Sequence, residues 1–364
     1  MAEASVALDL RTADRPLVIV VGAGGVGKTT LAASMGVASA AAGIRSLVMT
    51  FDPSLRLKDA LGVRDAPTDE EIEVPGMDGM LHAALLDARK TFDRLVERHA
   101  PDPEARRRIL ENPYYGHLAG QLGGILEYMA VERLFEVSSE ARYDRIFLDT
   151  PPTAQALDFL EAPTRVANFL DSGALKIALR QWFDGSGRLK VSRRMSFVGK
   201  GIESFLDKVV GMDLLRDMSE FFLAFEPMFK GFRGRADQVE SMLKSPNTMF
   251  VLVTGPGESR IADTLFFARK LKEKGHRLGP IIVNRQHPVL DPGNLAEGPT
   301  ATGAELLSWL GQGHRTGFDE LRRLLPDSQQ LVSLPVEPDE PTNLPSLKAL
   351  GEALNQKLRD QGPV

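Results

Sequence analysis

Short runs of apolar residues recur along the chain, and stretches with helical spacing of apolar and polar positions separate them. The runs are four to six residues long, as buried parallel strands are. The alternation of strands and helices predicts an α/β fold: a doubly wound, mostly parallel sheet. The predicted strands are Leu17–Val21, Ser46–Thr50, Leu81–Leu86, Arg145–Leu148, Met249–Thr254, Pro280–Val283 and Leu331–Leu334.

Two long stretches without strand patterns interrupt this alternation. The order of the strands and motifs predicts a core made of residues 1–90, 141–164 and 246–360. The remaining residues, 91–140 and 165–245, are expected to form an α-helical subdomain inserted in that core. Residues 66–79 are acidic and contain two prolines, so they are expected to form a loop or an edge of the sheet.

Composition narrows the possible partners and compartment. The net charge of −5 gives no general attraction to nucleic acid, and the absence of cysteine excludes a thiolate zinc site. The first fifteen residues include Glu3, Asp9 and Asp14 and lack the basic-then-apolar order of a signal peptide. No apolar stretch is long enough to span a membrane, so we expect a cytoplasmic protein.

The segment after the first predicted strand carries the clearest chemistry. It reads GAGGVGKT from Gly22 to Thr29, which is the pattern Gly-x4-Gly-Lys-Thr of a phosphate-binding loop (P-loop). We expect the backbone N–H groups of this loop to hold nucleotide phosphates, with Lys28 reaching the β- and γ-phosphates and Thr29 ligating Mg²⁺. The predicted phosphate-binding residues are Gly24, Gly25, Val26, Gly27, Lys28, Thr29 and Thr30.

Three segments together resemble one family. The loop GGVGKTT (Gly24–Thr30) resembles the deviant P-loop of signal-recognition GTPases and of division-site and partition ATPases. The segment DPSLRLKDAL (Asp52–Leu61) and the segment YDRIFLDTPPT (Tyr143–Thr153) resemble the two switch segments of arsenical-pump ATPases and of the ATPase that targets tail-anchored membrane proteins. The continuation ALDFLEAP (Ala156–Pro163) is closest to the bacterial anion-transporting ATPase branch of that family.

The resemblance implies roles for further residues. Asp149 follows an apolar strand and would hold Mg²⁺ through a water molecule, while Asp52 would orient or deprotonate the attacking water. Asn284 would contact adenine, and Pro335 would line the other side of the base. Because no acidic residue follows Asn284 at the position where GTPases carry an aspartate, ATP is expected rather than GTP. A purely structural Asn284, capping a turn, remains open.

One position departs from the family pattern. Ala23 stands where the family has a lysine that reaches across a dimer to the partner's nucleotide. Either Arg56 in the first switch replaces that cation, and is then a catalytic residue beside Lys28 and Asp52, or hydrolysis is slow. A second departure, Gly257 after Pro256, has no effect that the sequence reveals.

Two segments of the predicted helical subdomain have more than one possible role. A basic segment spans 176–200. A Phe- and Met-rich stretch spans 202–232 and is either a client-binding groove or a helix buried in its own subdomain or in a dimer interface. The favoured function is a dimeric ATPase, as a homodimer or with a paralogue, whose nucleotide state controls a surface for a hydrophobic or membrane-linked client. The alternatives are a slow or non-hydrolysing ATP-dependent scaffold and the energising subunit of an anion exporter. A membrane-recruited positioning ATPase is disfavoured, because residues 346–360 show an ordinary packing stripe.

Overall fold

The structure is a computed structural model that describes residues 8–14, 16–51, 56–113, 115, 125–151, 153–171, 217, 220–221, 223–290 and 299–361. The chain forms two compact units. Unit 1 comprises Met1–Leu86, Glu136–Leu157 and Met242–Val364, and unit 2 comprises Asp87–Phe135 and Asp158–Ser241. That these units act as an ATPase core and an inserted subdomain stays a prediction.

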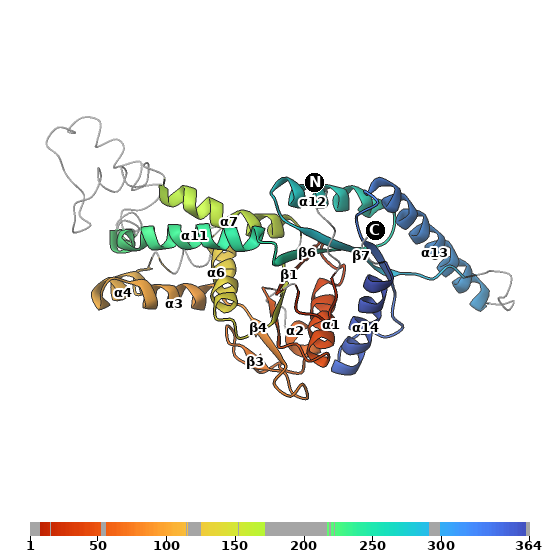
Figure 1. Cartoon of the computed structure of the whole chain (residues 1–364), viewed down its shortest axis with the longest axis horizontal. Coiled ribbons are helices and arrows are strands. Elements are labelled where there is room, and N and C mark those ends of the chain that lie inside the picture. Colours follow the sequence, from red (N-terminus) through yellow and green to blue (C-terminus); the bar gives the residue numbers. More distant parts are fainter. Residues whose placement is uncertain are drawn as a thin grey trace. The chain divides into compact units, whose positions relative to one another are not determined.

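Unit 1 contains a single sheet of eight strands among the residues described (Figure 1). The order is β3-β4-β2-β5-β1-β6-β7-β8, and all neighbouring strands are parallel except β3, which is antiparallel to β4. The predicted doubly wound α/β fold is therefore confirmed. The strands are β1 (Leu17–Gly22), β2 (Ser46–Thr50), β3 (Ile72–Glu73), β4 (Leu81–Leu85), β5 (Arg145–Asp149), β6 (Thr248–Thr254), β7 (Leu278–Gln286) and β8 (Leu331–Pro335).

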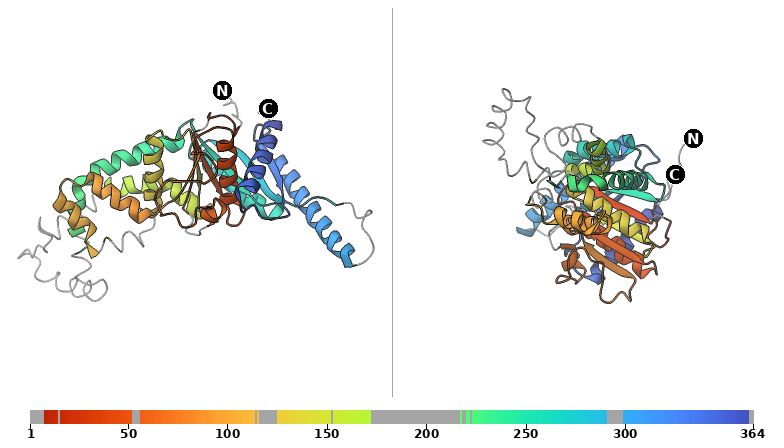
Figure 2. Two further views of the ribbon diagram at one scale, coloured as in Figure 1. Left: turned by 90° about the horizontal axis from the view of Figure 1, so that it is seen from below. Right: turned by 90° about the vertical axis from the view of Figure 1, so that its left-hand side faces the viewer.

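Helices cover both faces of this sheet. The helices α1 (Lys28–Ala41) and α14 (Leu344–Asp360) lie side by side on one face (Figure 2), with the short α2 (Arg56–Ala60) next to α1. On the opposite face, α12 (Ile261–Glu273) packs on β6 and β7, and the 3₁₀ turn η2 (Glu258–Arg260) precedes it (Figure 1). The long α13 (Pro299–Leu324) leaves Leu306, Leu307 and Trp309 between 41% and 68% exposed.

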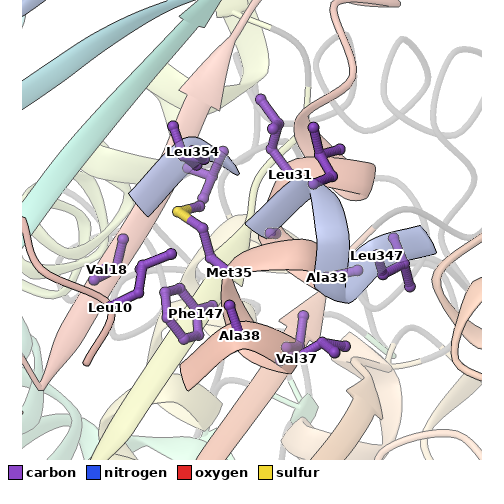
Figure 3. Close-up of a cluster of buried hydrophobic side chains, with 14 of the residues drawn as sticks. Leu10, Val18, Leu31, Ala33, Met35, Val37, Ala38, Phe147, Leu347 and Leu354 are labelled. Carbon is purple, nitrogen blue, oxygen red and sulfur yellow. The ribbon is translucent and has the colours of Figure 1, made fainter. Parts of the chain in front are cut away.

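Alternate residues of the strands point into the core beneath α1 and α14. Met249, Val251 and Val253 of β6 belong to this cluster, together with Leu31 and Met35 of α1. Figure 3 shows Met35 between Phe147 of β5 and Leu354 of α14. The residues between them on each strand face the other side, so the strands are buried on both faces, as parallel strands require.

A short segment at the start of the described chain is fastened to unit 1. Leu8 and Leu10 are fully buried, and the backbone N–H of Leu10 donates to Asn355 of α14 over 2.7 Å. Arg145, the first residue of β5, is fully buried and donates to the carbonyl oxygen atoms of Asp9 and Thr12. Burial lowers the pKa of the Arg145 guanidinium to about 10.

Unit 2 is helical where it is described. Its helices are α3 (Ala88–His99) and α4 (Pro103–Leu110), with the larger parts of α6 (Ile125–Ser139), α7 (Thr153–Asp171) and α11 (Phe229–Lys244), which continue into unit 1, and the 3₁₀ turn η1 (Glu226–Met228). The core of unit 2 is rich in aromatic rings, among them Phe92, Tyr115, Phe221, Phe225, Phe229 and Phe232.

This aromatic core bears on the two possibilities left open for residues 202–232. The described rings of that stretch, such as Phe225 and Phe229, are 6% exposed and pack on one another. In the part of the stretch that is described, the buried core is therefore found rather than an open groove. Residues 202–216, 218, 219 and 222, and the whole basic segment 176–200, lie outside the described residues.

In the part of the chain that the structure describes, no helix is both long and apolar enough to cross a lipid bilayer.

Candidate nucleotide-binding site

A cavity of about 760 Å³ opens at the carboxyl ends of the central strands of unit 1. This edge of a doubly wound sheet is where such folds bind ligands, because the loops that follow the strands converge there. A cavity of about 810 Å³ lies between residues 10–11, α1 and α14, but no residue of the P-loop lines it. The residues around the first cavity are Gly24, Gly25, Gly27, Lys28, Thr29, Thr30, Phe51, Arg56, Asp59, Ala60, Thr150, Pro151, Arg285, Glu340, Pro341 and Thr342.

The loop between β1 and α1 depends on a glycine at its end. Gly27 has φ 92° and precedes the first residue of α1. A Cβ atom at this position would lie 2.5 Å from Nδ2 of Asn284, so no larger residue fits without moving that side chain. The Nζ atom of Lys28 donates to the carbonyl oxygen of Ala23 over 2.9 Å, so the lysine is folded back over the loop.

Beside the loop, two hydroxyl groups converge on one carboxylate. Asp149 is the last residue of β5 and is 1% exposed. Its Oδ2 atom accepts hydrogen bonds from Oγ1 of Thr29 over 2.6 Å and from Oγ1 of Thr50 over 2.9 Å. These are hard oxygen donors, next to a phosphate-binding loop, of the kind that Mg²⁺ prefers, so the residues fit that ion. The structure thus brings together the two predicted metal-site residues, Thr29 and Asp149.

Asn284 contacts the P-loop in this structure. It lies near the end of β7, is 7% exposed, and its Nδ2 atom donates to the carbonyl oxygen of Val26 over 2.8 Å. In this arrangement the amide joins β7 to the P-loop, which is close to the structural alternative left open above. Pro335 ends β8 and pairs in register with Gln286 of β7. Neither Asn284 nor Pro335 is among the described residues that line the cavity.

The predicted catalytic residues are described in part. Lys28 and Arg56 both line the cavity, and Arg56 is the exposed first residue of α2. Asp52 belongs to residues 52–55, which lie outside the described part of the chain. Ala23 is half-buried and its side chain packs against the hydrophobic core, so the loop itself supplies no cation at that position.

Several cavity residues were not anticipated. Arg285, Glu340 and Thr342 line its wall, and the sequence indicated one of them only in that Arg285 follows Asn284.

Gly257, the second departure from the family pattern, has φ 94°. A Cβ atom on Gly317 of α13 would lie 2.7 Å from the carbonyl carbon of Gly257. The loop after β6 and α13 therefore touch backbone to backbone, which explains the glycine at position 317, while the positive φ explains the glycine at position 257.

Comparison with known proteins shows the family to which this chain belongs. The family model described as anion-transporting ATPase matches residues 16–293, well over half of the chain. The chain belongs to the anion-transporting ATPase family. This confirms the resemblance seen in the three motifs, and the family consists of P-loop ATPases.

Individual relatives match this family member over different lengths. Protein Rv2184c of Mycobacterium tuberculosis is 33% identical over 42% of this chain and 38% of its own length. ATPase GET3 of Zygosaccharomyces rouxii is 27% identical over 57% of this chain and 65% of its own length. ATPase GET3B of Arabidopsis thaliana is 23% identical over 92% of this chain and 77% of its own length. The chain thus spans less than two thirds of the length of the first two relatives.

Proposed function

We propose that the protein binds ATP in the cavity beside the P-loop and hydrolyses it. The main support is the 2.6 Å contact between Thr29, at the end of the P-loop, and Asp149, at the end of β5. Thr29 and the residue before it, Lys28, both line the cavity. Family membership supports the same reaction class. A glycine-rich turn with no nucleotide to bind would need neither a buried carboxylate at the strand end nor a lysine turned toward the loop.

The loop supplies most of the binding. Backbone N–H groups from Gly24 to Gly27 and at the start of α1 surround the phosphates, and Thr30 belongs to that first helical turn. Lys28 exchanges its contact with the carbonyl oxygen of Ala23 for the β- and γ-phosphate oxygen atoms. Since a neutral carbonyl is a weaker partner for an ammonium than phosphate is, this exchange favours the bound state.

Thr29 and Asp149 would hold Mg²⁺, Thr29 directly and Asp149 through a water molecule. When bound, the ion neutralises charge on the β- and γ-phosphates. Thr50 donates to the same carboxylate oxygen as Thr29 and keeps Asp149 oriented. Replacing Asp149 by asparagine would disturb both contacts.

Two residues of the first switch would act on the reaction itself. We assign Asp52 to the attacking water, on the resemblance of its segment to the family motif. Arg56 lines the cavity and would supply the cation that Ala23 cannot, stabilising charge on the transferred phosphate.

A slow ATP-dependent switch is the second candidate function, and Ala23 is the observation that favours it. With no lysine at that position, closure of the site would have to bring Arg56 to the phosphate. If closure is rare, the protein holds ATP for long periods and acts as a scaffold.

We further propose that the protein works as a dimer in the cytoplasm and that its nucleotide state controls binding of a hydrophobic or membrane-linked client. These proposals rest on the family resemblance rather than on contacts in unit 2. The particle mass in solution, measured with and without ATP, tests the first of them: a mass of one chain under both conditions contradicts it.

Nucleotide choice provides the test of the binding site. No acidic residue follows Asn284 to accept the protons of guanine, so ATP and ADP should bind at least tenfold more tightly than GTP and GDP, about the value of one lost hydrogen-bonded contact. Calorimetric titration of all four nucleotides in the presence of Mg²⁺ measures this. Equal affinities would contradict the assignment of ATP.

A further inference from the structure

The end of β7 contains a bulge beside the nucleotide cavity. Val283 pairs with Ser333 of β8, and Gln286 pairs with Pro335, so β7 uses one residue more than β8 between these two pairs. The additional residue falls at Asn284 and Arg285. A bulge redirects the side chains at its position, and bulges are frequent next to functional sites.

Arg285 occupies this bulge in a conformation that suits glycine. Its φ is 62°, whereas most described residues with positive φ are glycines. A side chain in the left-handed region is strained, so a glycine would be the more stable choice at this position. The presence of arginine instead points to a role for its side chain.

The surroundings of Arg285 show where that side chain lies. Both Arg285 and Glu340 line the nucleotide cavity, together with Pro341 and Thr342. An Nη2 atom of Arg285 lies 3.3 Å from Oε1 of Glu340, and the two side chains are 50% and 68% exposed. An ion pair this exposed adds little to stability. It does orient the planar guanidinium at the cavity wall.

A guanidinium held by a carboxylate is suited to a different task from Lys28. Glu340 accepts a hydrogen bond from an Nη2 atom of the guanidinium over 3.3 Å. The two faces of the guanidinium plane are not used by the ion pair, and such faces stack on aromatic rings. In a nucleotide the aromatic ring is the base.

We propose that Arg285 is a base-contacting residue: its guanidinium, positioned by Glu340, stacks on the purine ring of the bound nucleotide. This inference rests on the proposed function, because it needs a nucleotide in the cavity. It adds a stacking contact to the hydrogen-bonding role expected of Asn284, whose Nδ2 atom donates to the carbonyl oxygen of Val26.

The test compares a ligand that has a base with one that has none. The dissociation constants of ATP and of inorganic tripolyphosphate, both with Mg²⁺, are measured for the wild type, Arg285→Ala, Arg285→Lys and the control Arg323→Ala. Arg323 is an exposed arginine of α13 that does not line the cavity. Arg285→Ala should raise the dissociation constant of ATP about tenfold, the size of a partly desolvated cation–π contact, and leave that of tripolyphosphate unchanged.

Arg285→Lys should bind ATP with an affinity between those of the wild type and Arg285→Ala, since an ammonium keeps the charge but lacks the planar face. Arg323→Ala should match the wild type. If Arg285→Ala weakens the binding of ATP and of tripolyphosphate equally, Arg285 contacts phosphate and the inference is wrong. Unchanged ATP binding also overturns it. If the wild type itself binds no ATP, the proposed function fails as well, which separates the two failures.

A second comparison separates the side chain from the backbone. Arg285→Gly relieves the strain that Arg285→Ala retains, so without nucleotide the glycine variant should melt a few degrees higher than the alanine variant. Both should weaken ATP binding by the same factor. If the glycine variant instead binds ATP as the wild type does, the bulge alone accounts for the conformation and the inference is overturned.

Discussion

Short polar contacts between residues far apart in the sequence assemble the site. Thr29 meets Asp149 across 120 positions, and Asn284 meets Val26 across 258. Each contact joins the P-loop to a different strand end, so the loop is supported on two sides before any ligand binds. Preorganisation of this kind reduces the ordering that nucleotide binding requires.

The missing cation at position 23 leads to a prediction about Arg56. If Arg56 replaces it, Arg56→Ala should lower the rate of ATP hydrolysis about a thousandfold, as loss of an arginine that stabilises the transition state does, with little change in ATP affinity. Single-turnover hydrolysis and equilibrium binding measure the two effects separately.

Ala23→Lys is the matched variant for this prediction. It should change the rate little if Arg56 already supplies the cation. The opposite pattern, a faster Ala23→Lys and an Arg56→Ala that hydrolyses ATP like the wild type, would show that the cation was never replaced. The slow switch would then be the better description.

Among the elements, β5 has two functions at its two ends. Its last residue, Asp149, faces the cavity, and its first residue, Arg145, fastens residues 8–14 to unit 1. Arg145 also lies 3.4 Å, from Nη1 to Oγ, from Ser39 of α1, so the guanidinium joins β5, α1 and the first described segment. Burial disfavours its charge, and the carbonyl acceptors around it compensate.

The anchoring of residues 8–14 predicts a stability effect. Arg145→Met keeps most of the side-chain volume but removes the buried guanidinium that donates to the carbonyl oxygen atoms of Asp9 and Thr12. The free energy of unfolding should fall by about 3 kcal/mol. Urea denaturation measures it, with Arg45→Met as the control.

Arg45 pairs with Asp144 over 2.7 Å, but both side chains are well exposed, 53% and 35%. Its replacement should leave the unfolding midpoint unchanged, because exposed ion pairs contribute little. An Arg145→Met variant as stable as Arg45→Met would mean that the segment is not held by this guanidinium.

The elements show why part of the structure was predictable from the sequence. Buried parallel strands are continuous apolar runs, so β1, β2 and β4 to β8 were found from their composition alone. The edge strand β3 has two residues and no such pattern. The P-loop residues were also found, because a local motif encodes them.

Other features depend on contacts that no local pattern reveals. The contact of Gly257 with Gly317 and the bulge at Arg285 exist only once distant segments have packed. The expectation that Asn284 faces the base came from the family motif. In the structure its Nδ2 atom donates to the carbonyl oxygen of Val26 in the P-loop. Its role in base recognition stays a prediction.

In the molecule as a whole, the described part of unit 1 contains a candidate binding site, and the described part of unit 2 contains a hydrophobic core. Unit 1 has an α/β fold with a P-loop and a cavity that the P-loop lines. Unit 2 has an aromatic core that includes Phe92 and Phe225, whose ring centroids are 5.7 Å apart. The described rings stabilise the unit itself, so a client surface would have to come from other residues or from another conformation.

Steady-state phosphate release, measured for the wild type, Asp52→Asn and Lys28→Ala over a range of protein concentrations, shows whether this chain hydrolyses ATP with the residues assigned above. We expect turnover by the wild type only: Asp52→Asn should bind ATP with near wild-type affinity but release no phosphate, and Lys28→Ala should lose binding itself. Wild-type turnover no faster than that of Asp52→Asn would contradict this expectation.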